Sequence, residues 1–264
     1  MHYRFIIALL LHAALLLIPQ TSKAQIVNVQ EMFLNDSKEG LILGINGKTE
    51  IKKGNIDYEY YSAQAVLRYR KSTHTVLGAA NVEYAEKSQN SFTNRHFEHL
   101  RYRWNFYGDF GFDCFVQHEF NEFRRLNLRF ISGAGLYWHI LDKKKFDIFF
   151  GSTYMYEYNE LSTGEFADSG DIWKEHRWNN YITINTTITK TTRFIATAYY
   201  QPQFADFKDF NMNLDFDIYF SINKMLSLVI NYNYSRQSNP PISVKKTDHI
   251  LVAGISFRTG PFFK

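Results

Sequence analysis

The stretch FNMNLDFDIYFSI spans residues 210–222 and alternates between two kinds of side chain. Every second residue from Phe210 to Ile222 is apolar, while the residues between them are two asparagines, two aspartates, a tyrosine and a serine. Side chains of a β-strand point alternately to opposite faces, so this stretch predicts a strand with one hydrocarbon face and one polar face. A helix, with 3.6 residues per turn, cannot separate the two sets.

Weaker copies of this alternation recur at residues 100–107, 126–130, 182–188, 226–235 and 251–257. In one of them, Leu126, Leu128 and Phe130 are expected to share a face opposite Arg129. Many runs reach the about 9–11 residues that a tilted strand needs to cross a bilayer. Strands of soluble sandwiches are usually shorter, about 5–6 residues.

Twelve strands account for most of the chain, and we expect them at 39–51, 55–70, 74–86, 93–108, 110–120, 124–141, 145–158, 173–189, 192–204, 209–222, 224–237 and 246–258. The predicted fold class is therefore all-β. It is a single antiparallel transmembrane β-barrel of twelve strands, with ten or fourteen strands as near alternatives.

The expected connections alternate between short and long. The short ones are residues 71–73, 109, 142–144, 190–191 and 223, and the longer ones include 87–92, 159–172, 205–208 and 237–245. Outer-membrane barrels have short periplasmic turns and longer outer loops, and aromatic residues gather at their membrane interfaces. Aromatic residues make up 17% of this chain and cluster near strand ends, as in 154–158. We therefore expect the outer membrane of a Gram-negative bacterium, with both termini periplasmic.

The first residues have the features of a secretory signal. Arg4 gives a positive start, residues 5–18 are apolar apart from His12, and Ala24 follows small residues. The apolar run is shorter than the about 20 residues of a spanning helix. We expect four segments: a signal peptide at 1–24, a short periplasmic lead-in at 25–38, the barrel at 39–258 and a C-terminal tail at 259–264.

Charge and cysteine content exclude some classes of protein. Removing residues 1–24 loses Arg4 and Lys23 but no acidic residue, so the formal charge falls from +4 to +2, with 28 basic against 26 acidic residues. A nearly balanced charge gives no reason to expect a nucleic-acid partner. Cys114 is the one cysteine, so an internal disulfide is excluded, and it is expected on the lipid face as a small packing group.

Charged residues on the expected inner faces are the most informative candidates for function. They are Arg68, Glu83, Arg101, Arg103, Asp113, Arg129, Asp215 and Asp217. A small barrel either fills its interior with such side chains or leaves a narrow polar path. Because both signs are present in similar number, a plug of ion pairs is favoured, and a selective pore is the sharper alternative.

Some histidines and acids lie close together in the sequence without forming a ligand pattern. His96 and Glu98 share a strand face, whereas His99 lies on the other. A metal site needs convergent ligands, so solvated strand-end side chains are favoured here. His118 and Glu119 are interpreted in the same way, and we expect no metal and no cofactor.

A barrel hydrolase is the enzymatic alternative, because an interfacial serine beside a histidine could cleave lipids. Ser62, Ser152, His118 and His139 are the candidates, but no spacing forces a serine against a histidine. We therefore assign no catalytic residue and expect the protein not to be an enzyme.

Several short segments together carry a family resemblance. They are Lys53-Gly54-Asn55, the SGAGLYW stretch at 132–138, Tyr200-Gln201-Pro202, and Asn239-Pro240-Pro241 leading to Lys246-Thr247-Asp248. In this order and spacing the chain resembles the YdiY-like salt-induced outer-membrane proteins, a domain of unknown function, from about Gly40 to Phe257. The resemblance implies an outer-membrane barrel and provides no established catalytic residues. Phe257 fits the terminal aromatic residue of many such barrels, although residues 258–264 follow it.

The expected function is an envelope protein of unknown specific activity, either a narrow channel or a protein linked to salt and osmotic stress. The alternatives are a closed structural or ligand-binding barrel that acts through its outer loops, and an outer-membrane lipid hydrolase. The expected partners are outer-membrane lipid, lipopolysaccharide and the barrel-insertion machinery. The sequence does not identify a small solute.

Overall fold

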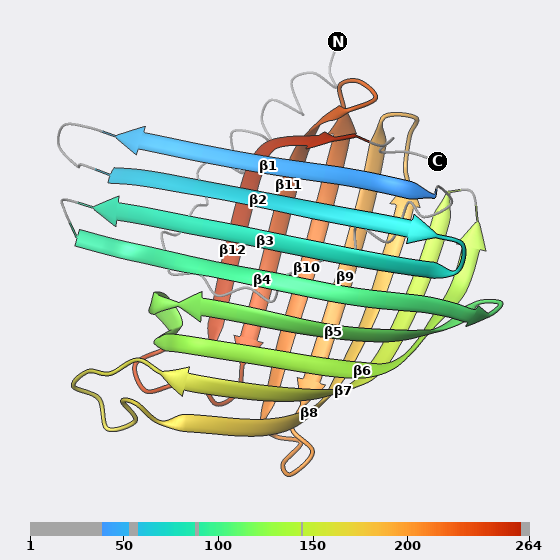
Figure 1. Ribbon diagram of the computed structural model, residues 1–264. Coiled ribbons are helices and arrows are strands. Elements are labelled where there is room, and N and C mark those ends of the chain that lie inside the picture. Colours follow the sequence, from blue (N-terminus) through green and yellow to red (C-terminus); the bar gives the residue numbers. More distant parts are fainter. Residues whose placement is uncertain (1–38, 53–57, 88–89, 144, 260–264) are drawn as a thin grey trace.

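A computed structural model describes residues 39–52, 58–87, 90–143 and 145–259. Within them, twelve strands follow one another around a single closed barrel, and β1 pairs with β12 to close it (Figure 1). Every described pairing between neighbouring strands is antiparallel. The predicted twelve-stranded barrel is therefore confirmed. The signal peptide and lead-in expected at 1–38 lie outside the described residues, as does most of the expected tail.

The strands are β1 (Gly40–Lys52), β2 (Tyr58–Lys71), β3 (His74–Lys87), β4 (Asn90–Tyr107), β5 (Phe110–Asn121), β6 (Leu126–Lys143), β7 (Phe146–Leu161), β8 (Ile172–Thr187), β9 (Thr192–Pro202), β10 (Phe210–Ser221), β11 (Leu226–Gln237) and β12 (Thr247–Arg258). A short 3₁₀ helix, η2 (Glu122–Arg124), joins β5 to β6. No helix in the described ranges is long and apolar enough to cross a membrane.

Turns gather at one end of the barrel and the longer loops at the other (Figure 1). The expected loop at 87–92 is the exception, because β3 runs to Lys87 and β4 starts at Asn90. Their pairing continues past a register shift at Ala85 and Glu86. A β-bulge leaves one residue of β4 unpaired, and the strand pairing continues beyond it. These two strands are therefore longer than their sequence pattern predicts.

The strand that decides the fold, β10, separates its side chains as expected. Asn211, Asn213, Asp215 and Asp217 are buried inside the barrel, and the apolar residues between them lie outside. The other strands continue this arrangement, so the exterior carries a band of exposed hydrocarbon side chains. It includes Leu67, Val82, Leu100, Val116, Leu136, Ile182, Leu228, Leu251 and Ile255.

Leu126 departs from the expected alternation. It was expected on the face of Leu128 and Phe130, but it is buried with 6% exposure, whereas Phe130 is 40% exposed. The register shifts between Leu126 and Leu128, which places the extra residue of a bulge there and turns Leu126 to the other face. The prediction for Leu126 is therefore wrong.

Glycines make room for aromatic rings on the inner face. Tyr181 lies directly across from Gly151, and a Cβ atom on Gly151 would come within 2.2 Å of the tyrosine ring. Tyr137 lies across from Gly111 in the same way. The missing side chain lets each ring lie flat against the neighbouring strand, so the lumen can hold large side chains.

Gly151→Ala should destabilise the barrel by about 1–3 kcal/mol, because the added methyl group forces the Tyr181 ring away from its site. Urea unfolding of protein refolded into lipid vesicles measures the change. Gly78→Ala is the matched control, since a Cβ atom there meets nothing within 4 Å. Equal stability of the two variants would contradict this account of the inner face.

Candidate functional site

The candidate site is the lumen, where the structure gathers the charged residues singled out from the sequence. Six of them are buried on the inner face: Arg68, Arg101, Arg103, Asp113, Asp215 and Asp217. Glu83 and Arg129 lie on the same face and are partly buried.

Asp113 on β5 is the centre of one ion-pair cluster and has no exposed surface. Its carboxylate lies 3.0 Å from Arg103 Nη2 and 3.4 Å from Arg101 Nη1. The hydroxyl of Tyr181, from β8, donates to the same carboxylate at 2.9 Å and accepts from Arg103 Nη2 at 3.0 Å. The Arg103 guanidinium also lies 4.1 Å from the centre of the Tyr137 ring. Side chains from β4, β5, β6 and β8 therefore meet inside the barrel.

Glu157 on β7 is the centre of a second cluster, nearer the looped end. It accepts from Arg177 at 2.8 Å and pairs with Arg129 at 2.9 Å. Arg177 also contacts Glu175 and, at 3.0 Å, Asp209. Arg129 also pairs with Glu119, which pairs with Arg95, so three arginines and four carboxylates form one network in which each of these charges has a partner of opposite sign.

Asp215 and Asp217 on β10 accept hydrogen bonds from amide side chains of β11. Asn231 Nδ2 donates to Asp215 at 2.8 Å and to Asp217 at 2.7 Å. Asn233 Nδ2 donates to the other oxygen of Asp215 at 2.9 Å. These contacts link β10 to β11 along the lumen wall.

Apolar side chains fill the lumen near the turn end. Tyr137, Phe149, Ile195 and Tyr219 form one buried cluster, with Val229 packed against it. These residues come from β6, β7, β9, β10 and β11. Because they reach across several strands, they pack the interior rather than line an open path.

Among the described residues, small cavities lie between the lumen side chains. One is lined by His99, Arg101, Gln117 and Met155 among others, and the second lies beneath the looped end beside Arg124. Each has a volume of about 30 Å³, which holds a few water molecules at most. Neither cavity is large enough for a sugar or an amino acid.

Three loops are fastened together at the looped end. Arg125, between η2 and β6, donates to Asp168 Oδ1 at 2.6 Å and to the Ile242 carbonyl at 3.0 Å. Asp168 Oδ2 accepts from the Ile242 N–H at 2.8 Å. Asp168 belongs to the β7–β8 loop and Ile242 to the β11–β12 loop. We call this group of Arg125, Asp168 and Ile242 the loop staple.

The loop staple depends on an ionised carboxylate. Burial raises the pKa of Asp168, but hydrogen bonds from Arg125 and from the Ile242 N–H outweigh burial and hold this pKa below its ordinary value of 3.8. Sequence reasoning did not find the staple, since its members lie in three separate loops. The only signal was the unusual length of the loops expected at 159–172 and 237–245.

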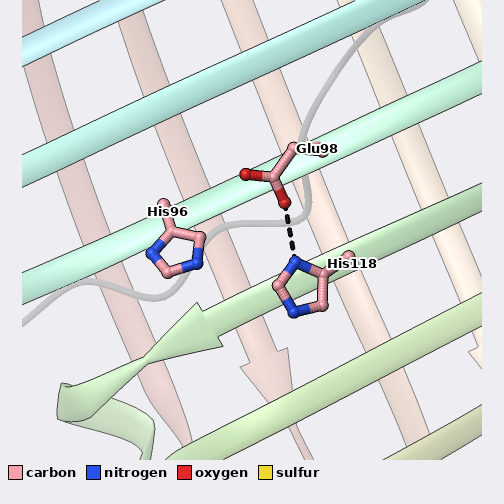
Figure 2. A group of neighbouring side chains, drawn as sticks. All are labelled: His96, Glu98 and His118. Carbon is pink, nitrogen blue, oxygen red and sulfur yellow. Dashed lines mark hydrogen bonds and ion pairs between the residues drawn. The ribbon is translucent and has the colours of Figure 1, made fainter.

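A further group lies on the outer face of the barrel and contains His96, Glu98 and His118 (Figure 2). His118 Nδ1 lies 2.7 Å from Glu98 Oε2. His96 and Glu98 share one face of β4, as expected. His99 lies inside, where its ring hydrogen-bonds to Gln117 at 3.1 Å. The pairing of β4 with β5 places His118 beside Glu98, and this pairing could not be deduced from the sequence pattern.

The hydrolase candidates lie on different parts of the barrel. Ser152 accepts from Trp178 Nε1 at 2.8 Å on β7, whereas His118 is on β5, with β6 between them. His139 stacks on Phe149, with ring centres 4.0 Å apart. Among the described residues, no hydrogen bond joins Ser62 or Ser152 to either histidine.

The fold and lumen define a twelve-stranded antiparallel barrel with a charged, packed interior. The chain belongs to the family described as "Protein of unknown function, DUF481", whose profile matches residues 49–257. This confirms the resemblance to the YdiY-like proteins, which form that family. No curated protein matches the sequence.

Several solved structures are similar at low sequence identity. The NanC porin is 12% identical, with 82% of this chain and 98% of that chain covered and a TM-score of 0.49. The KdgM porin in complex with disordered oligogalacturonate is 8% identical, with 82% and 98% covered and a TM-score of 0.44. The translocator domain of the autotransporter NalP from Neisseria meningitidis is 11% identical, with 85% and 90% covered and a TM-score of 0.44.

Asp113→Asn should lower the free energy of unfolding by about 3–5 kcal/mol, because it leaves two buried arginines without their shared carboxylate. Urea unfolding in lipid vesicles measures the loss. Asp109→Asn, at an exposed turn, should change stability by less than about 0.5 kcal/mol. The account fails if the two variants are equally stable.

The loop staple should respond to acid. Its stabilisation is complete above the ordinary pKa of Asp168 and is lost as the pH falls through the depressed value.

At neutral pH, Asp168→Asn should speed hydrogen exchange of the Ile242 amide by about tenfold, since a charge-assisted hydrogen bond is weakened. NMR in detergent micelles measures this rate. The Val244 amide, bonded to the Pro241 carbonyl, should be unaffected and is the control. An unchanged Ile242 rate would show that the staple does not hold the loop.

Proposed function

We propose that this protein is an outer-membrane barrel whose lumen is closed at rest and whose working surface is the fastened group of outer loops. Three sets of observations support the proposal: the apolar exterior, the packed interior and the loop staple. Each is a property of named side chains, and together they favour a structural or ligand-binding envelope protein without enzymatic activity.

The exterior supports residence in a membrane. Large apolar side chains are exposed on the outer face of every strand, and a soluble protein rarely exposes so many. The sheet closes on itself where Gly44 to Gly47 of β1 pair with Ile255 to Arg258 of β12, and the interior of a bilayer favours such closure because unpaired backbone groups are costly there. Trp104 and Trp138 are exposed toward the turn end of β4 and β6, where an interfacial girdle of aromatic residues is expected. We therefore place the barrel among outer-membrane lipid and lipopolysaccharide.

The orientation follows from the two kinds of connection. Short turns belong to the periplasmic side of such barrels and longer loops to the outside. An even number of strands then leaves the ends of β1 and β12 that lead to the termini on the periplasmic side. Insertion would use the cell's barrel-insertion machinery. Nothing in the described charge pattern favours a nucleic-acid partner.

The bond from Tyr181 to Asp113 is the single observation that carries the closed lumen. It joins β8 to β5 inside the barrel, and both residues are almost wholly buried. Arg124 makes a comparable link near the looped end, where it lies 2.6 Å from Asp248 on β12. Because these pairs are buried, salt screens them much less than surface pairs. The lumen would therefore stay closed in concentrated salt, as an envelope protein linked to salt stress requires.

A narrow channel is the second candidate. The observation that favours it is the run of inward charges, which includes Arg101 and Arg103 beside Asp113. Rearrangement of these pairs could open a charged path. A lipid hydrolase is less well supported, since the described serine and histidine candidates lie apart.

Conductance of the refolded protein in planar bilayers separates the first two candidates. The closed barrel should show no steady conductance steps in either dilute or concentrated potassium chloride, whereas an open porin in the same bilayers does. Steps in the wild-type protein that shift when Arg101 and Arg103 are replaced by glutamine would overturn the closed lumen and establish the channel.

A further inference from the structure

The outer face of the barrel contains a group of side chains that the closed lumen and the loops do not explain. His96 and Glu98 on β4 and His118 on β5 turn their polar atoms toward one another (Figure 2). One possible ligand atom from each of the three side chains lies within 4.8 Å of the other two. Two imidazole rings and one carboxylate therefore lie close enough together to face a common ligand.

Strand register holds this arrangement in place. Glu98 lies directly across from His118, and His96 lies across from Phe120. His96 is two residues before Glu98, so it occupies the diagonal position toward His118 on the same face. The ring centres of His96 and His118 are 5.7 Å apart. The backbone of two paired strands thus fixes all three Cβ positions.

The surroundings make an ionised carboxylate costly at this place. The neighbouring outward residues Leu100 and Val116 are apolar and exposed. A carboxylate beside hydrocarbon needs a partner that neutralises it. His118 provides one, with a 2.7 Å contact. Among the described residues, His96 makes ring contacts with Phe120 and His118 and no hydrogen bond. Its nitrogen is therefore available as a ligand.

We propose that His96, Glu98 and His118 form a binding site for a divalent transition-metal ion, with zinc as the best match. Two imidazole nitrogens and one carboxylate oxygen are a ligand set that zinc accepts, and the fourth position stays open for water. Binding would also neutralise Glu98, which removes the cost of that charge on the outer face. The proposal does not depend on whether the lumen is closed.

The geometry needs only a small adjustment to hold the ion. Zinc bonds of about 2.0–2.2 Å place tetrahedral ligand atoms about 3.4 Å from one another. The separation of His118 Nδ1 from Glu98 Oε2, 2.7 Å, is shorter than that value, and all the ligand atoms lie within 4.8 Å of one another. Glu98 and His118 have side-chain exposures of 55% and 44%, so rotation of exposed side chains can close the difference.

A second group, His139, Asp142 and Asp147, is a weaker candidate at the turn end. Asp147 is buried and already accepts from Asn185 at 2.7 Å. A metal there would have to break that contact. The exterior group has no such competing bond, apart from the pairing of His118 with Glu98.

Competition with a chromophoric zinc chelator at neutral pH tests the proposal on full-length refolded protein in detergent. The wild-type protein should bind zinc at this site. His118→Gln and Glu98→Gln should each weaken that affinity by at least about tenfold, because each removes one of three ligands. Two variants are used so that a folding defect in one does not decide the result, and the gel mobility of unheated samples reports folding.

His176→Gln is the matched control. His176 is also on the outer face and contacts the Tyr154 hydroxyl, and the described residues give it no carboxylate partner. This variant should bind zinc as the wild type does. Urea unfolding gives an independent measurement, since zinc should stabilise the wild type and His176→Gln but not His118→Gln. Absence of zinc binding, or equal affinity in all four proteins, would overturn the proposal.

Discussion

The pairing of charge inside the barrel is the constraint on which the rest of the structure depends. Asp113 has no exposed surface and lies between Arg101 and Arg103, with Tyr181 as a further donor. A buried charge without a partner destabilises a protein by several kcal/mol, so these residues fix one another's positions. Because Tyr181 comes from β8 and Asp113 from β5, the same contacts that satisfy the charges also bridge the inner surface over β6 and β7, and near the looped end Arg124 reaches Asp248 on β12. Glycines such as Gly151 make this possible by leaving room for the rings.

The apolar exterior and the charged interior are two results of one alternating pattern. Strands present mainly hydrocarbon to the outside and mainly polar groups to the lumen, as β10 does from Phe210 to Ser221, while apolar clusters such as Phe149 with Ile195 pack inside near the turn end. The loop staple extends this organisation to the looped end, where Arg125 and Asp168 tie three loops over the barrel. A barrel built in this way has a rigid wall, a packed interior and an ordered outer surface. These properties favour a function at the loops over transport through the lumen.

Periodicity made most of the fold predictable, because the two faces of a strand follow directly from the order of residues. The same rule placed Arg103 and Asp113 on inner faces. It failed at Leu126, where a bulge changes the face without a recognisable sequence signal. Periodicity could not predict which charged residues pair with one another, because the pairing depends on the register between strands. Thus His118 joins His96 and Glu98 only once β4 and β5 are aligned. Contacts between loops, such as Arg125 with Asp168, are set by the whole fold.

Thiol labelling inside the lumen tests the central claim most directly. Met155 lies on the inner face of β7 with 1% exposure, beside Phe115 and Ile131. The protein for this measurement carries Met155→Cys in a Cys114→Ser background, and the reagent is a small charged thiol-reactive compound added to protein in lipid vesicles. The closed lumen predicts almost no labelling until the protein is unfolded, because the adjoining cavity of about 30 Å³ is too small for the reagent. Rapid labelling of the folded protein would contradict it and show that solutes reach the middle of the barrel.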